Sequence, residues 1–544
     1  MGKKNDKQEF VAHITPRSED FSQWYTDVIL KTDLVDYAPV RGCMVIKPYG
    51  YALWERMQAE LDKRFKATGH QNVAMPMLIP ESLLLKEAEH VEGFAPEVAW
   101  VTQGGNEVLP ERLAIRPTSE TLFCTMYAKW VQSWRDLPMK YNQWCSVMRW
   151  EKTTRPFLRT SEFWWQEGHT IHATPEEAQE ETLLMLDVYR DFAENVLALP
   201  VLTGRKTDKE KFAGARATYS MEAMMQDGKA LQAGTTHNFG TNFSEAYGIQ
   251  FLSKEGKLEY AHETSWGTST RLIGAIVMTH GDERGLKLPP RVAPIQVVIL
   301  PIAMHKEGVL ERARALKAEL EAAGLRVELD DRDTYSAGWK FNEWEMKGVP
   351  VRLELGPRDI ENGVAMSMRR DTLEKKPLQL DGIADTVKAL LDDIHNTMFE
   401  QARAFRDAHI YTATTLEELE AVFYAFAQDD PDGNGEDDTL GISGANFDFH
   451  YVFGAYGIMR NTYNLNEDGS VTYTSITEPY KNALKTLAAW YQEGLIDPES
   501  FTDDRAALRE KWSSGMIGIM NDNAWWGESA RGNNSVFNML LNRD

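Results

Sequence analysis

The sequence is poor in cysteine, in long apolar runs and in positive charge. Its 544 residues include three cysteines, Cys43, Cys124 and Cys145, which are far apart and form no CxxC pair. Isolated thiols cannot make a four-cysteine zinc site or a disulfide framework, so we expect buried free thiols and no structural zinc. The first residues, MGKKNDKQEF, are basic but precede no apolar run, which predicts neither a secretory signal nor a membrane helix. We therefore expect a cytoplasmic protein without a membrane partner.

The shortage of positive charge is uneven along the chain. Lys and Arg number 59 against 82 Asp and Glu, and the net charge is −23. Residues 411–544 hold 8 basic and 22 acidic side chains, a net charge of −14, which leaves −9 for residues 1–410. An acidic protein should repel nucleic acid as a whole. The first 410 residues can still bind it through local basic patches, because the distribution of charge decides where a polyanion binds.

The remaining composition is that of an ordinary globular protein, with 43% hydrophobic and 26% charged residues and room for about three or four domains. Up to residue 288, strands and helices interleave without a regular βαβ order, which favours an α/β (α+β) layer built on an antiparallel sheet. A proline-rich link at 288–296 leads into alternating strands and helices typical of a compact βαβ domain. Near residue 415 the composition shifts towards Asn, Gly, Asp and aromatics. We therefore predict domains at 1–288, 289–410 and 415–544.

Three groups of residues in the first domain carry the chemistry. Arg149 and Glu151 precede a short polar loop and the segment SEFWWQEGH, and the loop arginines offer planar donors for phosphate oxygens. Phe157 in that loop could stack on a flat base, whereas a surface hairpin with salt-bridged arginines would explain the same pattern. In the second group, Arg271 opens the apolar helix RLIGAIVMTH, where a buried arginine is costly unless an anion meets it. The third group, RPTSE at 116–120, suits an ammonium ligand or a capped helix.

In this order and at these separations, the three groups resemble the signature motifs of class II aminoacyl-tRNA synthetases. The segment GHQNVAMPMLIP, which contains Pro76, resembles motif 1 of that family. The segments MRWE and FLRTSEFWWQEGH resemble the two parts of motif 2, and GTSTRLIGA resembles motif 3. The segments VRGCMVIKPYGYALWERMQ, RPTSET, EAMMQDGKALQAGTTH and TSWGTSTRLIGAIVMTHGD look like the prolyl enzymes of the archaeal and eukaryotic type. The resemblance runs from about residue 16 to about residue 410.

This resemblance implies ATP-dependent activation of L-proline to prolyl-adenylate, followed by transfer to tRNA(Pro), with Mg²⁺ on the phosphates and a homodimer as the assembly. Arg149, Glu151 and Arg271 would be catalytic. The nucleotide would be bound by Arg149, Glu151, Phe157, Arg159, Gln232, Thr235 and Arg271. Proline, and the channel that admits the tRNA end, would be lined by Phe94, Thr118, Glu120, Arg149, Trp165, Glu167, His169, His237 and Ser269.

Two further expectations concern specificity. Only about 60 residues separate His169 from Gln232, too few for the editing domain that the bacterial type inserts there, so we expect no editing of mischarged tRNA in cis. The second domain resembles the class IIa anticodon-binding fold, a mixed βαβ domain. Its stretch GWKFNEWEMKGVPVRLELGPRD implies that the guanines of the anticodon are read by Lys340, Glu345, Arg352 and Arg358, although a solvated helix face would explain the first two equally well.

From about residue 415 the sequence resembles an α/β fragment of an extracellular solute-binding protein, which suggests a chimera. Asp430, Asp432, Asn434 and Asp438 match the start of a Ca²⁺ loop, but Gly441 stands where the closing glutamate of an EF-hand would be. A Ca²⁺-dependent carbohydrate- or peptide-binding protein with a synthetase-like region is therefore the alternative function. A threonine- or glycine-specific synthetase is the alternative within the enzyme class.

Overall fold

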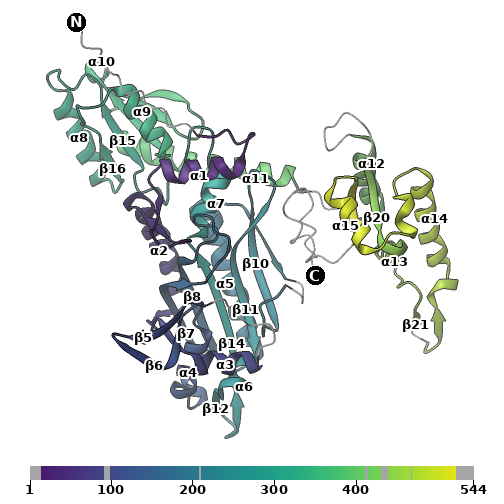
Figure 1. Ribbon diagram of the computed structural model, residues 1–544. Coiled ribbons are helices and arrows are strands. Elements are labelled where there is room, and N and C mark those ends of the chain that lie inside the picture. Colours follow the sequence, from purple (N-terminus) through teal and green to yellow (C-terminus); the bar gives the residue numbers. More distant parts are fainter. Residues whose placement is uncertain are drawn as a thin grey trace. The chain divides into compact units, whose positions relative to one another are not determined.

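The computed structural model describes residues 14–90, 98–206, 210–410, 415–429, 439–466 and 468–521. It divides the chain into two compact units, one that runs to Arg406 and one that begins at Asp407. The first unit holds both domains of the synthetase-like region, and many of its elements are labelled in Figure 1. The fold is mixed α/β, with antiparallel and mixed sheets, as predicted.

A seven-stranded sheet forms the centre of the first domain. Its strands, in spatial order, are β3 (Gln71–Asn72), β7 (Met139–Met148), β8 (Glu162–His172), β14 (His262–Ser269), β11 (Ala230–Gly240), β10 (Ala217–Met224) and β9 (Val201–Arg205). All pairs are antiparallel except β3 with β7 at one edge. The expected antiparallel sheet is therefore present, and motifs 2 and 3 lie on its adjacent strands β8 and β14.

Helix α5 (Pro175–Leu197) covers one face of this sheet (Figure 1). It begins where the sequence predicts, because the Thr174 hydroxyl accepts from the Glu177 N–H, Pro175 occupies the first turn and acidic residues follow. The chain leaves the helix at Ala198, whose φ of 53° is left-handed. Its buried side chains, Tyr189 among them, pack against Trp266 in the largest apolar core. The opposite face of the sheet is therefore left for polar side chains.

The other elements of the first domain are short and surround the sheet. A three-stranded sheet and two hairpins are made by β4 (Leu78–Pro80), β6 (Glu107–Ile115) and β5 (Trp100–Gly104), by β1 (Val35–Tyr37) with β2 (Met44–Ile46), and by β12 (Gln250–Leu252) with β13 (Leu258–Tyr260). The helices are α1 (Phe21–Lys31), α2 (Pro48–Ala67), α3 (Glu81–His90), α4 (Glu120–Trp130), α6 (Asn242–Tyr247) and α7 (Arg271–His280).

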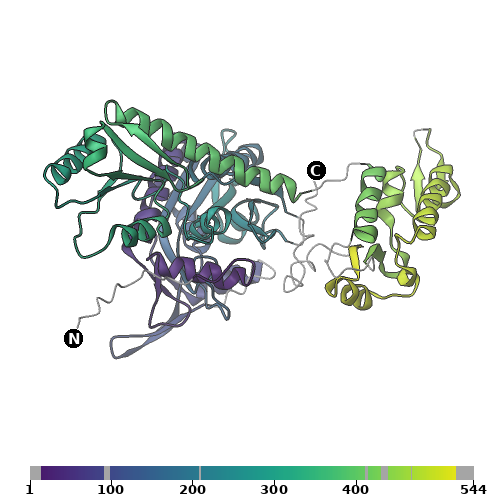
Figure 2. The same ribbon diagram turned by 90° about the horizontal axis from the view of Figure 1, so that it is seen from above.

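The second domain is a five-stranded sheet with helices. Its strand order is β16 (Val327–Leu329), β15 (Val297–Pro301), β17 (Val351–Leu355), β18 (Val364–Arg369) and β19 (Lys375–Gln379), in which the first three strands are parallel and the last two are antiparallel. The helices are α8 (Val309–Ala322), α9 (Ala337–Met346), α10 (Pro357–Glu361) and α11 (Ile383–Ala408), and Figure 2 shows α11 as one long unbroken helix. The predicted βαβ pattern is present in β15, α8 and β16.

A buried ion pair joins the two domains. The Arg370 guanidinium donates to both carboxylate oxygens of Asp282 at 2.8 and 2.6 Å, and its Nε donates to the Glu345 carbonyl at 2.7 Å. Lys287 adds a second cation 3.1 Å from Asp282. Burial alone would raise the pKa of Asp282, but the hydrogen bond and charge of Arg370 hold that pKa well below its usual value. Asp282 follows α7, so the pair connects the second domain to the helix that Arg271 begins.

Replacing Arg370 by methionine is expected to lower the free energy of unfolding by about 3 kcal/mol, because the largely buried Asp282 carboxylate loses its bidentate partner and keeps only Lys287 as a neighbouring cation. The measurement is the urea denaturation midpoint. The control is Arg284→Met, which removes an ion pair to Glu345 at 2.7 Å from an arginine whose side chain is 57% exposed. That surface pair should contribute less than about 1 kcal/mol. Equal losses in the two variants would contradict the prediction.

The unit that begins at Asp407 has its own apolar core. Its elements are α12 (Leu416–Gln428), β20 (Leu440–Gly444), α13 (His450–Ala455), β21 (Tyr463–Leu465), β22 (Val471–Tyr473), α14 (Glu478–Gln492), α15 (Arg505–Ser513) and β23 (Ile517–Asn521). Strands β20 and β23 are parallel, and Phe423 and Trp490 pack edge to face in the core. Among the helices of the described residues, none has the length and apolar character to span a membrane.

The predicted Ca²⁺ ligands Asp430, Asp432, Asn434 and Asp438 lie outside the described residues, so the Ca²⁺ loop stays a prediction. A different acidic cluster of this unit, Asp497, Glu499 and Asp503, surrounds Lys511. The Lys511 ammonium lies 3.0 Å from Asp497 and 2.7 Å from Asp503, so it occupies the place that a cation would take.

Candidate active site

Strand pairing brings polar residues from distant parts of the sequence into rows on the face opposite α5. One row crosses four strands as His169, Ser265, His237 and Thr218. The next row contains Glu167, Gly267, Thr235 and Ser220. Side chains two apart on a strand share a face, so both rows project to the same side of the sheet. Gly267 carries no side chain, which leaves room between Glu167 and Thr235.

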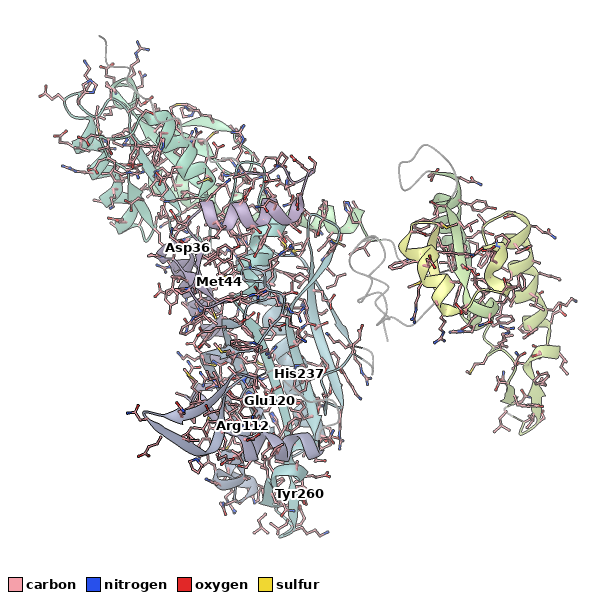
Figure 3. The ribbon with its side chains drawn as sticks, in the orientation of Figure 1. Asp36, Met44, Arg112, Glu120, His237 and Tyr260 are labelled. Carbon is pink, nitrogen blue, oxygen red and sulfur yellow. The ribbon has the colours of Figure 1, made fainter. Side chains whose placement is uncertain are left out.

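These rows line a cavity of about 250 Å³. Glu120 from α4 and His237 from β11 both lie over the large sheet, as Figure 3 shows. The predicted residues that line the cavity are Thr118, Glu120, Arg149, Trp165, Glu167, His169, Gln232, Thr235, His237, Ser269 and Arg271. The three groups of the sequence, far apart along the chain, therefore meet in one site.

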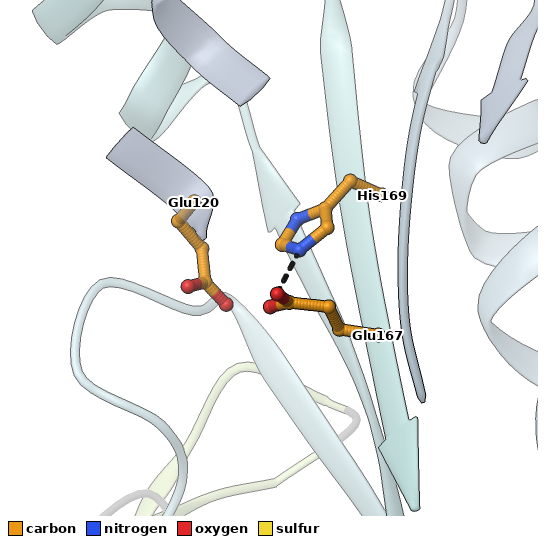
Figure 4. A group of neighbouring side chains, drawn as sticks. All are labelled: Glu120, Glu167 and His169. Carbon is orange, nitrogen blue, oxygen red and sulfur yellow. Dashed lines mark hydrogen bonds and ion pairs between the residues drawn. The ribbon is translucent and has the colours of Figure 1, made fainter. Parts of the chain in front are cut away.

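One end of the cavity is acidic. Glu120 reaches it from the first turn of α4, and Glu167 and His169 reach it from β8 (Figure 4). The potential ligand atoms of these three buried side chains lie within 4.8 Å of one another. Two carboxylates at this separation repel each other unless a cation lies between or beside them. His169 pairs with Glu167, so it is beside Glu120 that the acidic end fits a further cation such as an ammonium group.

Glu167 is the most heavily hydrogen-bonded group of this end. Its carboxylate accepts from the Ser119 N–H at 3.1 Å, from the Ser119 hydroxyl, from Gln143 Nε2 at 2.7 Å, and contacts His169 Nε2 at 3.1 Å. Because these donors use its lone pairs, the three side chains are a poor ligand set for a metal ion. Glu120 accepts from the Thr118 hydroxyl, and the Glu120 carboxylate is the better placed of the two to receive a ligand.

The Glu167–His169 pair is held in its charged form. Burial would raise the pKa of Glu167, but the hydrogen bonds from His169, Ser119 and Gln143 lower it below the usual value of a glutamate. Burial would lower the pKa of His169, but its hydrogen bond to Glu167 and the charge of Glu120 raise it. His237, by contrast, has its pKa lowered to about 3 by burial and by the charge of Lys206, so its imidazole is neutral.

The other end of the cavity is basic. Arg149 Nε donates to the Pro117 carbonyl at 3.1 Å, and its guanidinium lies 5.4 Å from the ring centre of Phe163 and 5.5 Å from that of Trp165. Arg271 donates to the Leu158 carbonyl at 3.1 Å and to the Gln232 carbonyl at 3.2 Å.

Burial lowers the pKa of Arg149 and of Arg271, and in Arg271 the neighbouring Arg149 and Arg159 lower it further. Arginine nevertheless stays charged in proteins. Two like charges aimed into one buried space are stabilised by an anion.

Phe157 does not take the place predicted for it. It has a φ of 58° and is 4% exposed, because the loop turns its ring into the apolar core beneath the sheet. The aromatic ring that lines the cavity beside Arg149 is Phe163. Strand alternation contained this signal, since Phe163 precedes Trp165 by two residues on β8 and shares its face.

The other predicted nucleotide contacts lie at the rim. Glu151 accepts from Arg159 Nε at 2.8 Å, and the Arg159 side chain is 64% exposed, so neither lines the cavity. Phe94 lies outside the described residues. Lys206 was not predicted, yet it lines the cavity and its ammonium donates to the Gln232 side chain. No residue pattern marked it, because Lys206 follows an edge strand far from the three motifs.

Three of the four predicted anticodon residues are engaged within the protein. Lys340 is 5% exposed and donates to the Asp330 carbonyl at 3.0 Å. Arg352 is 9% exposed and donates to Glu354 at 3.0 Å, and Glu345 pairs with Arg284 at 2.7 Å. Arg358, which follows β17, is exposed. The burial of Lys340 contradicts the expectation of a solvated helix face at this position.

Glu263 is a buried carboxyl group next to the acidic end. It accepts from Ser244 Oγ at 2.6 Å and from Cys124 Sγ at 3.1 Å. Burial raises the pKa of Glu263 to about 7, although these two hydrogen bonds oppose the shift. Below about pH 4.5 the group is neutral in both the folded and the unfolded chain. As the pH rises towards 7, the unfolded chain loses the proton first, so this group favours unfolding.

Replacing Glu263 by glutamine is expected to remove that pH dependence. Relative to wild type, the variant should gain about 3 kcal/mol of unfolding free energy between pH 4.5 and pH 8, because folding raises the pKa of Glu263 from 4.5 to about 7. Denaturant unfolding at several pH values measures it. Lost or gained hydrogen bonds would shift the stability of the variant equally at all pH values, so a difference that does not change with pH would contradict the prediction.

Known proteins that resemble this chain are aminoacyl-tRNA synthetases, as the site residues led us to expect. Residues 105–280 match the family model of the tRNA synthetase class II core domain (G, H, P, S and T), and residues 296–390 match that of an anticodon binding domain. The chain is 67% identical over 419 residues to a proline–tRNA ligase of Acetoanaerobium sticklandii, a match that covers 77% of this chain and 87% of the relative.

Proline–tRNA ligases of Alkaliphilus oremlandii and Clostridium novyi are each 64% identical, over 78% and 76% of this chain and 87% of each relative. None of these matches supports the alternative of a solute-binding protein, and neither family model extends beyond residue 390. Together with the cavity, whose acidic end fits an ammonium and whose basic end fits phosphate, these matches show that the chain belongs to the family of proline–tRNA ligases, which are class II aminoacyl-tRNA synthetases.

Proposed function

We propose that the cavity holds proline and ATP end to end, with one substrate at each of its charged ends. The observation that carries this proposal is the separation of charge along one cavity, with Glu120 and Glu167 at one end and Arg149 and Arg271 at the other. The secondary ammonium of proline lies by Glu120 and Thr118, and its ring packs against Trp165. The enzyme is a proline–tRNA ligase, so its substrates are L-proline, ATP and tRNA.

Adenylate formation needs positioning and charge stabilisation more than it needs proton transfer. The proline carboxylate, ionised at neutral pH, attacks the α-phosphorus; a C–O–P bond forms and the bond to the pyrophosphate oxygen breaks. Arg149 belongs to the basic end but lies close enough to Glu120 and Glu167 for their charges to act on it; there it contacts the proline carboxylate and the α-phosphate and stabilises the developing charge. Arg271 contacts the phosphates farther from the reacting centre. No general base is required for this step.

The remaining contacts follow from the cavity wall. Phe163 stacks on adenine in place of Phe157, while Glu151 and Arg159 contact the nucleotide from the rim. Gln232 and Thr235 face the ribose and phosphates, and Ser269 and His237 face the terminal adenosine of the tRNA. Class II synthetases use ATP with Mg²⁺, which would be held mainly by the phosphates, because Glu167 is occupied by hydrogen bonds from Ser119 and Gln143.

Discrimination against alanine depends on this cavity alone. Among the described residues, the chain between His172 and Ala230 forms α5, β9 and β10 and no inserted domain. A pocket that binds proline rejects a smaller side chain by only about 1–3 kcal/mol. We therefore infer that alanyl-tRNA made by this enzyme is not hydrolysed in cis. Deacylation of alanyl-tRNA(Pro) by the purified protein would refute this inference.

Proline-dependent exchange of pyrophosphate into ATP tests the proposed function. Exchange should require proline, and threonine or glycine should not replace it.

We further propose a cytoplasmic homodimer that contains no structural zinc, with domains at 1–288 and 289–410. The segment 415–544, for which Ca²⁺ binding remains a proposal, is a solute-binding-protein-like addition. Mass spectrometry of the native polypeptide across residues 411–424 would test whether the addition is part of the natural chain.

A further inference from the structure

A stacked pair of aromatic rings, of which Tyr335 is exposed and Trp339 half-buried, lies at the start of α9 in the second domain. The rings of Tyr335 and Trp339 are nearly parallel, with their centres 3.8 Å apart and an angle of 11° between their planes. Tyr335 is nevertheless 38% exposed. The Ser336 hydroxyl between them accepts from the Trp339 N–H at 3.3 Å and begins the helix. The pair therefore presents a flat π surface at the edge of the protein.

Arg332 fixes this surface in place. Its guanidinium lies 5.1 and 5.4 Å from the centres of the two rings. It donates to Asp330 at 2.8 and 2.6 Å and to Glu343 at 2.5 Å. Buried Asp330 also accepts from Trp344 Nε1 at 2.8 Å. Asp330 is therefore held both by Arg332 of the loop and by Trp344 of α9. A surface already ordered in this way loses little conformational entropy when a ligand binds.

The surface lies where open α/β sheets bind ligands. Strands β15, β16 and β17 are parallel, so the segments that follow their carboxyl ends meet at one edge of the sheet. The aromatic pair follows β16. Exposed Lys306 follows β15, and exposed Arg358 follows β17. Two cations that no described ion pair engages therefore occupy the same edge as the rings.

We propose that Tyr335, supported by Trp339 and Arg332, is the platform on which an unpaired base of the anticodon loop stacks. Proteins read single-stranded RNA by stacking splayed bases on aromatic and arginine side chains. Exposed Asp331 and Asp333 on the same loop would repel a phosphate, so the platform fits a base. The phosphates on either side of that base are matched by Lys306 and Arg358. The proposal rests on the use of tRNA by this enzyme.

Aminoacylation of a tRNA(Pro) transcript by Tyr335 variants tests the platform. Tyr335→Ala should lower kcat/KM for the tRNA by about 5- to 150-fold, the range expected for one base–aromatic stack. Tyr335→Phe keeps the ring and should keep kcat/KM. Proline-dependent pyrophosphate exchange, which needs no tRNA, should stay within about twofold of wild type in both variants. Exchange that persists while aminoacylation falls separates the platform from the activity itself.

Tyr260 provides a matched control, because it is also 38% exposed. It lies at the end of the first domain far from the second domain, as Figure 3 shows, so Tyr260→Ala should aminoacylate tRNA normally. A transcript with 2-aminopurine in the anticodon loop should lose fluorescence on binding wild type and keep it with Tyr335→Ala. The proposal is overturned if Tyr335→Ala aminoacylates tRNA with the wild-type kcat/KM, or if Tyr335→Phe loses as much as the alanine variant.

Discussion

Replacing Arg149 by alanine is expected to lower proline-dependent pyrophosphate exchange about a thousandfold. Arg149 is a buried cation of the cavity, and three surrounding carboxylates, Glu120, Glu167 and Glu151, favour its charge. The charge that develops at the α-phosphorus is met by this guanidinium without reorganisation. Removing one such donor from a buried site costs about 3–4 kcal/mol in the transition state.

The loss should appear in kcat as well as in KM, because the proposed contact of Arg149 is with the group that changes charge during the reaction. Arg149→Lys should recover only part of the activity, since an ammonium cannot donate to two oxygens in one plane. The matched control is Arg190→Ala, which removes an arginine with a 48% exposed side chain that pairs with Asp187 on α5. Normal exchange by Arg149→Ala, or an equal loss in the control, would refute the role assigned to Arg149.

The sequence predicted eleven of the residues that line this cavity but neither Lys206 nor Phe163, and it did not predict how they are arranged. Glu167 and His169 are two apart on one strand, so a shared face follows from the period of a strand. The same alternation separates Trp165 from Trp164, which is 39% exposed and packs on Tyr51. The row that joins His169 to His237 depends on pairing between β8, β14 and β11. No local pattern fixes the register of strands that lie so far apart in the chain.

Three predicted residues lie in other surroundings than their residue types suggest, for physical causes of the same kind. Phe157 lies in a loop without periodicity, and only its left-handed φ sends the ring into the core. Lys340 and Arg352 are residue types that usually lie at the surface, but Asp330 and Glu354 receive them in the interior. A sequence does not display the partner of a buried charge when that partner comes from another element. No sequence pattern marks the stacked rings of Tyr335 and Trp339, because aromatic residues near a helix start usually belong to the core.

The acidic end provides the second large effect. Replacing Glu120 by glutamine is expected to raise KM for proline about a hundredfold, while KM for ATP should change less than about threefold. Glu120 is 5% exposed and lies in the first turn of α4, where the helix N-terminus favours its negative charge. Its one described hydrogen bond comes from Thr118, so the carboxylate is free to receive the proline ammonium. Removing one partner of a buried, hydrogen-bonded charge pair costs about 2–5 kcal/mol.

The amide of glutamine keeps the shape of the side chain and its bond from Thr118, so the fold should persist and the loss should report the missing charge. Glu120→Asp retains the charge at a greater distance and should fall between wild type and the glutamine variant. Glu180→Gln, on the exposed face of α5, supplies the neutral comparison. If the glutamine variant raised KM for ATP as much as KM for proline, Glu120 would serve the nucleotide, and the division of the cavity into an ammonium end and a phosphate end would be wrong. Unequal effects, with Arg149→Ala lowering kcat and Glu120→Gln raising only KM for proline, are what that division requires.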